Sequence, residues 1–149
     1  MKRIMIEKDK CTGCMGCVLA CMCEHNQKGK SIYDLDLEDI ENESRNHLEL
    51  DAAGNPVPII CRHCTEAECT ITCMSGAMTK DESTGLVNYD DKRCASCFMC
   101  IMSCPYGVLK PDRKNLKIIM KCDMCSGRDI PRCVEECPTG AIYLVEVTE

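Results

Sequence analysis

Sixteen of the seventeen cysteines in this 149-residue chain fall into four sets of four. The sets are Cys11, Cys14, Cys17 and Cys21; Cys61, Cys64, Cys69 and Cys73; Cys94, Cys97, Cys100 and Cys104; and Cys122, Cys125, Cys133 and Cys137. A 4Fe–4S cubane has four iron corners, and each corner needs one thiolate. The sixteen grouped cysteines therefore predict four 4Fe–4S clusters, with iron bound through these residues and no ligand missing.

The spacing within the sets is typical of ferredoxins. In the first and third sets, three closely spaced cysteines are followed by a fourth after three further residues. Three thiolates on one tight loop can reach three corners of a cubane, whereas a fourth cysteine on the following helix points toward a neighbouring cluster. The second and fourth sets keep this plan but have four and seven residues between their second and third cysteines. Each set is therefore expected to work with a partner set.

Zinc binding and disulfide formation are two other uses of cysteine. Zinc also binds Cys-x-x-Cys pairs, but such sites usually use two distant pairs and have no need of the third cysteine found in the first and third sets. A disulfide framework would suit a secreted chain. The segment from Met1 to Lys8 lacks an apolar core and a twin-arginine signal, so we expect a cytoplasmic protein with reduced thiols.

Composition limits the fold and the classes of partner. With one Phe, four Tyr and no Trp, the apolar core must be thin, and iron–thiolate bonds are expected to supply much of the folding free energy. No apolar run approaches the roughly eighteen residues of a membrane-spanning helix, which excludes an integral membrane protein but not a peripheral one. The formal charge of −6 at pH 7 makes nucleic acid an improbable partner.

The chain is built on an internal repeat of ligand loop, short helix and turn. In the last three units a glycine follows the fourth cysteine, where it can accept the positive φ of a turn; these residues are Gly76, Gly107 and Gly140. Strand-like runs are predicted at residues 3–7, 86–89, 116–120 and 142–147. The first and last of these runs could pair as a small sheet.

An acidic insertion at residues 24–56 separates the first two units. Residues 31–43 are rich in Asp and Glu, and their apolar residues fit either an alternating or a helical period. A solvated face and a docking surface are both compatible with this pattern. The second half predicts a hairpin that turns at Gly54 and Asn55 and leads to Cys61.

Several residues beside the cysteines have more than one interpretation. Cys23 is expected to be a buried thiol that acts as a small apolar residue, with a substitute ligand or a redox-active thiol as the alternative. The methionines at 15, 22, 74, 99, 102 and 124 are expected to fill gaps near the cysteines or to exclude water from them. His63 is not expected to bind iron; Arg62 and His63 would donate to sulfur or face solvent.

Basic residues also flank the ligand loops, at Lys8, Lys10, Lys92, Arg93 and Lys121. Positive charge at these places would favour the reduced form of a nearby cluster. Ordinary balancing of the surface charge of an acidic protein is the other interpretation. His25 and His47 have no partner pattern in the sequence.

The order of the four motifs resembles a known family. The Cys-Arg-His-Cys start of the second unit, its Cys-Met-Ser-Gly-Ala end and the Cys-Pro-Thr-Gly-Ala of the fourth are similar to the iron–sulfur subunits of the dimethyl-sulfoxide-reductase family. Within it, the chain most resembles the ferredoxin-like electron-transfer subunit of carbon monoxide dehydrogenase. The resemblance implies a small, loop-rich α+β fold, a duplicated bacterial ferredoxin with short helices and short antiparallel strands around four cubane clusters.

The resemblance also implies which cysteines share a cluster. Cluster 1 would be held by Cys11, Cys14, Cys17 and Cys137; cluster 2 by Cys122, Cys125, Cys133 and Cys21; cluster 3 by Cys61, Cys64, Cys69 and Cys104; and cluster 4 by Cys94, Cys97, Cys100 and Cys73. Residues 1–149 would form one polyferredoxin domain, with an outer half at 1–23 and 115–149 and an inner half at 57–110. Met follows Cys21 and Cys73 where the family has Pro, so changed packing with retained ligation is expected there.

The predicted function is electron transfer without a catalytic site of its own. The chain has no nucleotide-binding glycine motif and no defensible catalytic arrangement, and its cysteines are used as ligands. The resemblance implies relay of single electrons from carbon monoxide dehydrogenase to a flavin-dependent NAD(P) oxidoreductase or a hydrogenase. The alternatives are the β subunit of a molybdenum or tungsten oxidoreductase, such as formate dehydrogenase or aldehyde oxidoreductase, and a zinc-binding interaction module.

Overall fold

A computed structural model describes residues 1–114 and 116–147. The elements in chain order are β1 (Lys2–Ile6), the 3-10 turn η1 (Lys8–Lys10), α1 (Gly16–His25), η2 (Ile32–Asp34), β2 (His47–Leu50), β3 (Pro56–Ile59), α2 (Glu68–Ile71), β4 (Met78–Lys80), β5 (Val87–Tyr89), η3 (Asp91–Arg93), α3 (Met99–Met102), β6 (Lys110–Pro111), β7 (Ile119–Met120), α4 (Arg132–Glu135) and β8 (Ile142–Glu146). Helices α2, α3 and α4 have four residues each. The expected loop-rich fold of short helices and short antiparallel strands is confirmed.

Within the described residues the strands form four separate antiparallel pairs, β1–β8, β2–β3, β4–β5 and β6–β7. The predicted pairing of the first and last runs is confirmed, with Ile4 opposite Leu144 and the Ile4 side chain 1% exposed. The predicted hairpin before Cys61 is also present as β2–β3. The other two predicted runs form strands shorter than expected, β5 and β7, because their partners β4 and β6 offer only three and two residues.

All four cysteine loops share one unusual backbone feature. The residue before the second cysteine has a positive φ in every loop: +73° at Gly13, +46° at His63, +54° at Ser96 and +59° at Met124. A positive φ is disfavoured for residues with a Cβ atom and is found at strained functional loops. Loops of different sequence and length therefore turn in the same way at the same position.

Each helix begins at the end of a cysteine loop. The third cysteine of each set lies in the first two residues of its helix: Cys17 in α1, Cys69 in α2, Cys100 in α3 and Cys133 in α4. We expected the fourth cysteine to lie on the helix as well, and this is true only of Cys21 in α1. In the other units it lies two residues past the helix end, because those helices have a single turn. None of the helices in the described ranges is long and apolar enough to cross a membrane.

The turn after the fourth cysteine explains the difference in helix length. Gly76, Gly107 and Gly140 have φ of +65°, +61° and +65°, as predicted, and the N–H of each donates to the carbonyl oxygen of the fourth cysteine of its unit. The first unit has neither Gly nor Pro after Cys21, so α1 continues to His25 and reaches ten residues.

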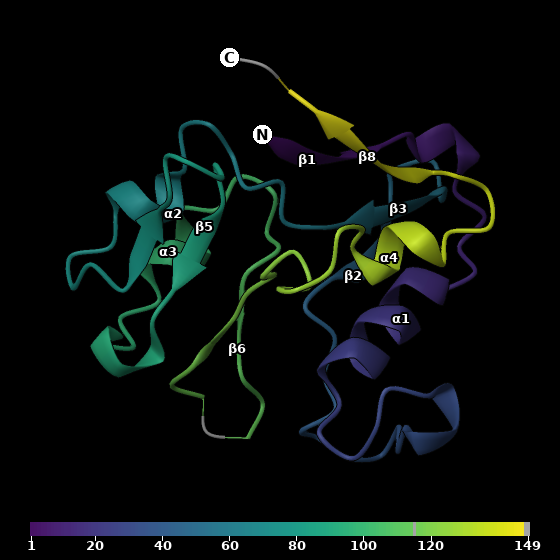
Figure 1. Ribbon diagram of the computed structural model, residues 1–149, viewed down its shortest axis with the longest axis horizontal. Coiled ribbons are helices and arrows are strands. Elements are labelled where there is room, and N and C mark those ends of the chain that lie inside the picture. Colours follow the sequence, from purple (N-terminus) through teal and green to yellow (C-terminus); the bar gives the residue numbers. More distant parts are fainter. Residues whose placement is uncertain (115, 148–149) are drawn as a thin grey trace.

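The elements gather in two regions, visible in Figure 1 on opposite sides of the β6–β7 hairpin. The α1–α4 region contains α1, α4, β1 and β8, and its buried residues Ile4, Cys17, Met124 and Ile142 form one core with Ile60. The α2–α3 region contains α2, α3, β4 and β5. Its core includes Met78, Val87, Val108, Leu109 and Ile119. Each region thus has a small apolar core that includes buried cysteines.

The acidic segment adopts turns rather than either predicted period. Its acidic side chains accept backbone hydrogen bonds two residues on, as Asp36 does from Glu38 and Asp39 does from Glu41. Such local bonds favour turns over regular structure. Lys110 of β6 binds Glu43 at 2.7 Å and ties the segment to the β6–β7 hairpin. Ile32, Tyr33, Leu37 and Ile40 remain exposed on it.

Candidate iron–sulfur cluster sites

None of the seventeen cysteines forms a disulfide, and several of them gather around cavities. One cavity is lined by Cys11, Cys14, Cys17 and Cys137, where the loop before α1 meets the turn after α4. Burial raises the pKa of Cys17 to about 11, and the neighbouring thiolates of Cys11, Cys14 and Cys137 contribute to the increase. A buried thiol surrounded by other thiols ionises readily only when a cation such as iron joins them.

A second cavity is lined by Cys61, Cys64, Cys69 and Cys104, between the second cysteine loop and the turn after α3. Burial raises the pKa of Cys69 to about 11, with smaller contributions from Cys61 and Cys104. The structure therefore brings three cysteines of the second set together with the last cysteine of the third.

The remaining cysteines gather in the same crossed manner. Burial raises the pKa of Cys133, and Cys122, Cys21 and Cys125 raise it further. Burial likewise raises the pKa of Cys100, and Cys73 and Cys94 raise it further. Cys97 is exposed beside this second group.

Cysteines of different groups lie close enough to influence one another's pKa. Beyond the effect of burial, the pKa of Cys133 is raised by Cys17, the pKa of Cys122 by Cys61, and the pKa of Cys69 by Cys100. The first pair links the cavity of Cys17 to the group of Cys133. The second pair links the group of Cys133 to the cavity of Cys61. The third pair links the cavity of Cys61 to the group of Cys100. These pairwise influences indicate a row of groups in that order.

Backbone N–H groups point at several sulfurs. In the third and fourth loops the residue with positive φ donates to the first cysteine: Ser96 to Cys94 Sγ and Met124 to Cys122 Sγ, both at 3.4 Å. Met78 N donates to Cys73 Sγ at 3.4 Å, and Arg45 N to Cys21 Sγ at 3.3 Å. Burial alone would raise the pKa of Cys73, but hydrogen bonds from Met78, Ser75 and Ala77 outweigh it and lower that pKa. Donors of this kind favour thiolate ligands and the reduced state of a cluster.

His63 is buried, with 1% of its surface exposed, which corrects the expectation that it might face solvent. Val87 N donates to its Nδ1 at 2.9 Å, so the proton of the neutral ring is on Nε2 and Nε2 has no lone pair for a metal. Burial, with the positive charges of Lys121 and Arg3, lowers the pKa of His63 to about 3. The buried Nε2–H has no partner within the described part of the chain and belongs to a side chain that lines the cavity of Cys61. Arg62 instead is exposed and stacks on Tyr106 at 4.4 Å.

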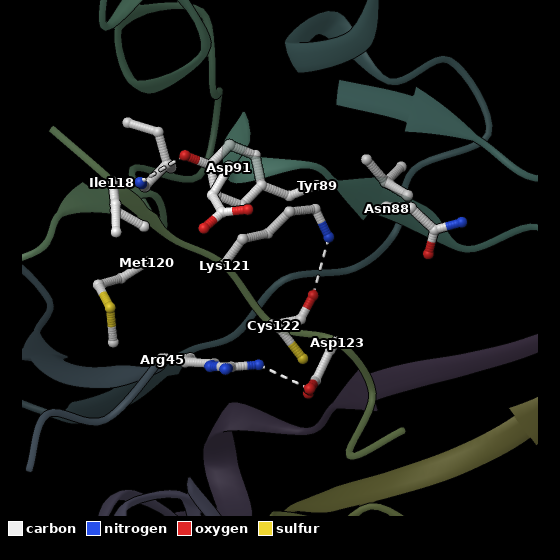
Figure 2. A pocket seen from close by; sticks show the side chains of 11 residues that line it. Arg45, Asn88, Tyr89, Asp91, Ile118, Met120, Lys121, Cys122 and Asp123 are labelled. Carbon is white, nitrogen blue, oxygen red and sulfur yellow. Dashed lines mark hydrogen bonds and ion pairs between the residues drawn. The ribbon is translucent and has the colours of Figure 1, made fainter. Parts of the chain in front are cut away.

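The flanking basic residues separate into two kinds. Lys8, Lys10, Lys92 and Arg93 are exposed, as charge balancing requires, whereas Lys121 is only 6% exposed. Figure 2 shows Lys121 in a pocket of about 380 Å³, with its Nζ donating to the carbonyl oxygen of Cys122 at 2.8 Å. The Arg45–Asp123 ion pair, at 2.7 Å, lies at the same pocket.

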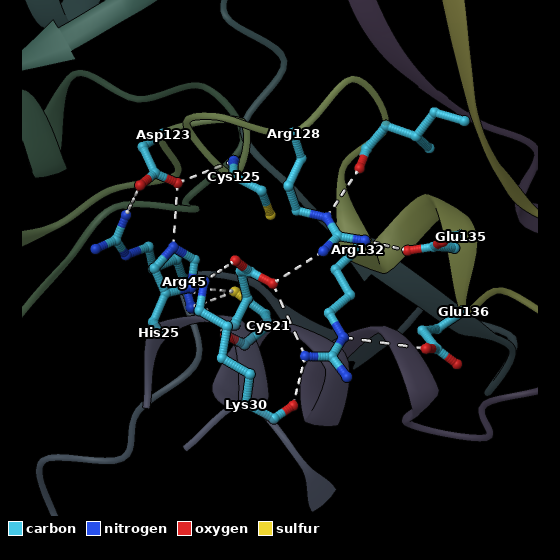
Figure 3. Close-up of polar contacts among 12 residues, drawn as sticks. Cys21, His25, Lys30, Arg45, Asp123, Cys125, Arg128, Arg132, Glu135 and Glu136 are labelled. Carbon is cyan, nitrogen blue, oxygen red and sulfur yellow. Dashed lines mark hydrogen bonds and ion pairs between the residues drawn. The ribbon is translucent and has the colours of Figure 1, made fainter. Parts of the chain in front are cut away.

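His25 has a partner that the sequence did not indicate. Its Nε2 donates to Asp123 Oδ1 at 3.1 Å and its Nδ1 to the carbonyl oxygen of Cys21 at 2.8 Å (Figure 3). The carboxylate of Asp123 and the carbonyl of Cys21 can only accept hydrogen bonds, so both ring nitrogens of His25 carry a proton. Burial alone would lower the pKa of His25, but Asp123 and Cys21 outweigh it and raise the pKa to about 9. His25 and Arg45 thus contact Cys21 from two separate segments, and Asp123 of a third segment joins them.

A second charged group joins α1 to α4. Glu24 is 8% exposed, and Lys30, Arg128 and Arg132 approach its carboxylate, the two arginines at 3.5 and 3.8 Å from Oε2. Figure 3 shows Arg128 and Arg132 side by side, with Glu135 and Glu136 as further partners. Burial alone would raise the pKa of Glu24, but the three cations outweigh it and lower that pKa.

Cys23 and the methionines are only partly as expected. Cys23 is 3% exposed, in agreement with the prediction of a small buried residue. Met124 is buried at 7%, as a gap-filling residue should be. The gap-filling prediction is wrong for Met74 and Met102, which are 96% and 78% exposed beside the ends of α2 and α3, because one-turn helices leave their ends uncovered. It is also wrong for Met15 and Met99, which are 44% and 42% exposed.

The donor chemistry fits iron–sulfur clusters. Within residues 1–114 and 116–147, no three His, Cys, Asp or Glu side chains stand close enough to share one metal ion, although four cysteines line each of two cavities. These observations agree physically, because each thiolate of a cubane binds a different iron atom and the four sulfurs stand farther apart than ligands of a single ion.

Comparisons with known proteins give the same cofactor. Residues 53–147 match the model of the 4Fe-4S dicluster domain. The chain is 30% identical to an "Iron-sulfur protein" of Rhodospirillum rubrum over 97% of this chain and 82% of that protein. It is 31% identical to "Electron transport protein HydN" of Escherichia coli strain K12 over 96% of this chain and 87% of that protein. Among solved structures, a chain of the active site complex BamBC of benzoyl coenzyme A reductase is similar, with a TM-score of 0.54 and 26% identity over 97% of this chain and 79% of that one.

Proposed function

This chain belongs to the 4Fe–4S dicluster domain family and is an electron-transfer iron–sulfur protein, and we propose that it relays single electrons between two partner enzymes. A 4Fe–4S cluster accepts and releases one electron at a time. The observation that supports the proposal is the series of neighbouring cysteine groups, in which Cys17 influences Cys133, Cys61 influences Cys122, and Cys100 influences Cys69.

The proposed ligand sets are those implied by the family resemblance. The two cavities support the first and third sets, since each is lined by the four cysteines assigned to it. The mutual effects of the thiols on their pKa values support the second set, in which burial and then Cys122, Cys21 and Cys125 raise the pKa of Cys133. The fourth set is supported by Cys73 and Cys94, which add to the effect of burial on the pKa of Cys100. The proposed outer and inner halves follow from this sharing of cysteines between loops.

The two ends of the row are the proposed points of electron entry and exit. The exposed cysteines are Cys14 and Cys97, and each belongs to one of the two terminal groups. The cysteines of the two middle groups are buried or half-buried. An electron can therefore approach the surface at either end, while the middle of the path is shielded from solvent. We propose that the chain has no substrate site of its own.

The proposed partners are carbon monoxide dehydrogenase as the electron donor and a flavoprotein oxidoreductase or a hydrogenase as the acceptor, in the cytoplasm. The support is the sequence resemblance to the electron-transfer subunit of that enzyme. A second candidate is the iron–sulfur subunit of a molybdenum or tungsten oxidoreductase. The similarity to a chain of the active site complex BamBC of benzoyl coenzyme A reductase supports a role as one component of an oxidoreductase complex.

The test is anaerobic purification of the tagged protein from its native cells, followed by mass spectrometry of the proteins retained in stoichiometric amounts. Recovery of a nickel-containing carbon monoxide dehydrogenase together with a second redox enzyme would support the first candidate. Recovery of a molybdopterin or tungstopterin enzyme would support the second. A catalytic turnover by the isolated chain alone would contradict the electron-relay proposal in both forms.

A further inference from the structure

Lys121 differs from every other basic residue beside the cysteine loops. It follows β7 directly and precedes Cys122, and only 6% of its surface is exposed. Its neighbours in the sequence pattern, such as Lys92 beside Cys94, are exposed. A lysine that only balances surface charge would keep its ammonium group in water.

The ammonium group of Lys121 lies between two cysteine groups. Its Nζ donates to the carbonyl oxygen of Cys122 at 2.8 Å and lies 3.9 Å from Cys61 Sγ. Cys122 belongs to the group of Cys133, and Cys61 lines the next cavity in the row. Lys121 therefore lies at a boundary between the α1–α4 region and the α2–α3 region.

Within the described residues Lys121 has no ion pair with a carboxylate. The nearby carboxylate of Asp123 is already engaged by Arg45 and His25. A buried cation without a counter-charge is strongly unfavourable. The negative charge that remains within reach is that of the cysteine thiolates, of which Cys61 Sγ lies 3.9 Å from the ammonium nitrogen.

We propose that Lys121 is the shared counter-charge of the two middle clusters and raises the midpoint potentials of both. The proposal rests on the ligand sets given above. Reduction adds one negative charge to a cluster, and a buried cation stabilises that added charge. Because Lys121 lies close to both middle groups, it raises the midpoint potentials of both clusters and keeps the two potentials similar. Similar potentials favour passage of the electron between the two clusters in either direction.

The test compares three full-length variants purified anaerobically with their clusters. Lys121→Gln removes the charge but keeps a donor for Cys122, Lys121→Arg keeps the charge, and Lys92→Met removes an exposed charge as the matched control. Iron and sulfide content is measured first, and the midpoint potentials are then obtained by redox titration followed by electron paramagnetic resonance. In Lys121→Gln we expect unchanged iron content and a shift of two of the four potentials to more negative values. Lys121→Arg and Lys92→Met should keep all four near their wild-type values.

Two results would overturn the proposal: unchanged potentials in a fully loaded Lys121→Gln protein, or an equal shift of all four clusters. If Lys121→Gln fails to bind iron, Lys121→Arg decides, because wild-type potentials there support the shared counter-charge and lowered potentials contradict it. Failure of the ligand sets is a separate result. It would appear as fewer than four clusters in the wild-type protein, whatever the lysine variants show.

Discussion

The α1–α4 region and the α2–α3 region hold similar cysteine loops by different forces. In the first, buried or half-buried charges join the elements: Glu24 meets three cations, and His25 and Arg45 share Asp123. In the second, the helices pack over Met78, Val87 and Leu109, and the polar contact between them is the hydroxyl pair of Thr72 and Ser103 at 3.0 Å. The loops keep the same positive φ before the second cysteine in both regions. The conserved element of the repeat is thus the loop, and the packing around it is free to vary.

The insertion explains much of the difference. Lys30 and Arg45 lie in residues 24–56 and supply cations to both charged groups of the α1–α4 region. The longer α1 supplies Glu24 and His25, which exist as helical residues only because no Gly or Pro ends the helix after Cys21. The α2–α3 region has neither an insertion nor a long helix, so it relies on apolar burial.

The largest expected effect comes from loss of a cysteine in one of the four sets. Cys133→Ser removes a buried thiol from the middle of the row, and we expect loss of about one cluster, or about four irons per chain, with greatly reduced stability. Cys23→Ser is the matched control, because Cys23 is equally buried, at 3% against 6%, but lies outside the sets. Iron analysis and the visible absorption of anaerobic protein provide the measurement. Equal iron loss in both variants would contradict the assignment.

The apolar packing of the α2–α3 region is tested by two methionines a few residues apart. Met78 is 3% exposed and Met74 is 96% exposed. We expect Met78→Ala to lower the free energy of unfolding by about 2–4 kcal/mol through a core cavity, and Met74→Ala to change it by less than about 0.5 kcal/mol. The midpoint of anaerobic, guanidinium-induced bleaching of the clusters compares them. Similar midpoints would show that this region does not depend on its apolar core.

The charged packing of the α1–α4 region is tested at Glu24. Glu24→Gln leaves Lys30, Arg128 and Arg132 without their shared carboxylate, and we expect a loss of roughly 1–3 kcal/mol. Glu135→Gln removes an exposed partner of Arg128 and should cost below about 1 kcal/mol. The same bleaching midpoints rank the two variants. A larger effect at Glu135 would show that the buried carboxylate is not the centre of the group.

A smaller and pH-dependent effect follows from the lowered pKa of Glu24. The three cations keep its folded-state pKa below the ordinary value of 4.5, so the carboxylate contributes its full stabilisation above that pH. As the pH falls below 4.5, the unfolded chain takes up the proton first and the contribution is lost. The difference in midpoint between wild type and Glu24→Gln should therefore shrink between neutral pH and a pH of about 4. A difference that stays constant would exclude ionised Glu24 as its source.

The sequence predicted the parts of the molecule that depend on local rules. The cysteine spacing, the glycine turns at 76, 107 and 140 and the pairing of the first and last strands follow from chain geometry and residue type. The contacts of His25 with Asp123 and of Lys121 with Cys61 join residues 98 and 60 positions apart. Such contacts are determined by tertiary packing. No local sequence pattern around His25 or Lys121 predicts the contact partner of either residue. Asp123 alone could have been noticed, as an acidic residue inside a cysteine loop.

The pairing of β1 with β8 has a consequence for how the protein is made. Strand β1 leaves the ribosome early, but its partner and the turn that contains Cys137 emerge only after most of the chain has been translated. The α2–α3 region, whose core includes Ile119, is complete before that point. Synthesis at about 5–20 residues per second therefore leaves the cysteines before and within α1 without their C-terminal neighbours for several seconds. During that interval the nascent chain depends on the cell to deliver iron and to shield these thiols from oxidation.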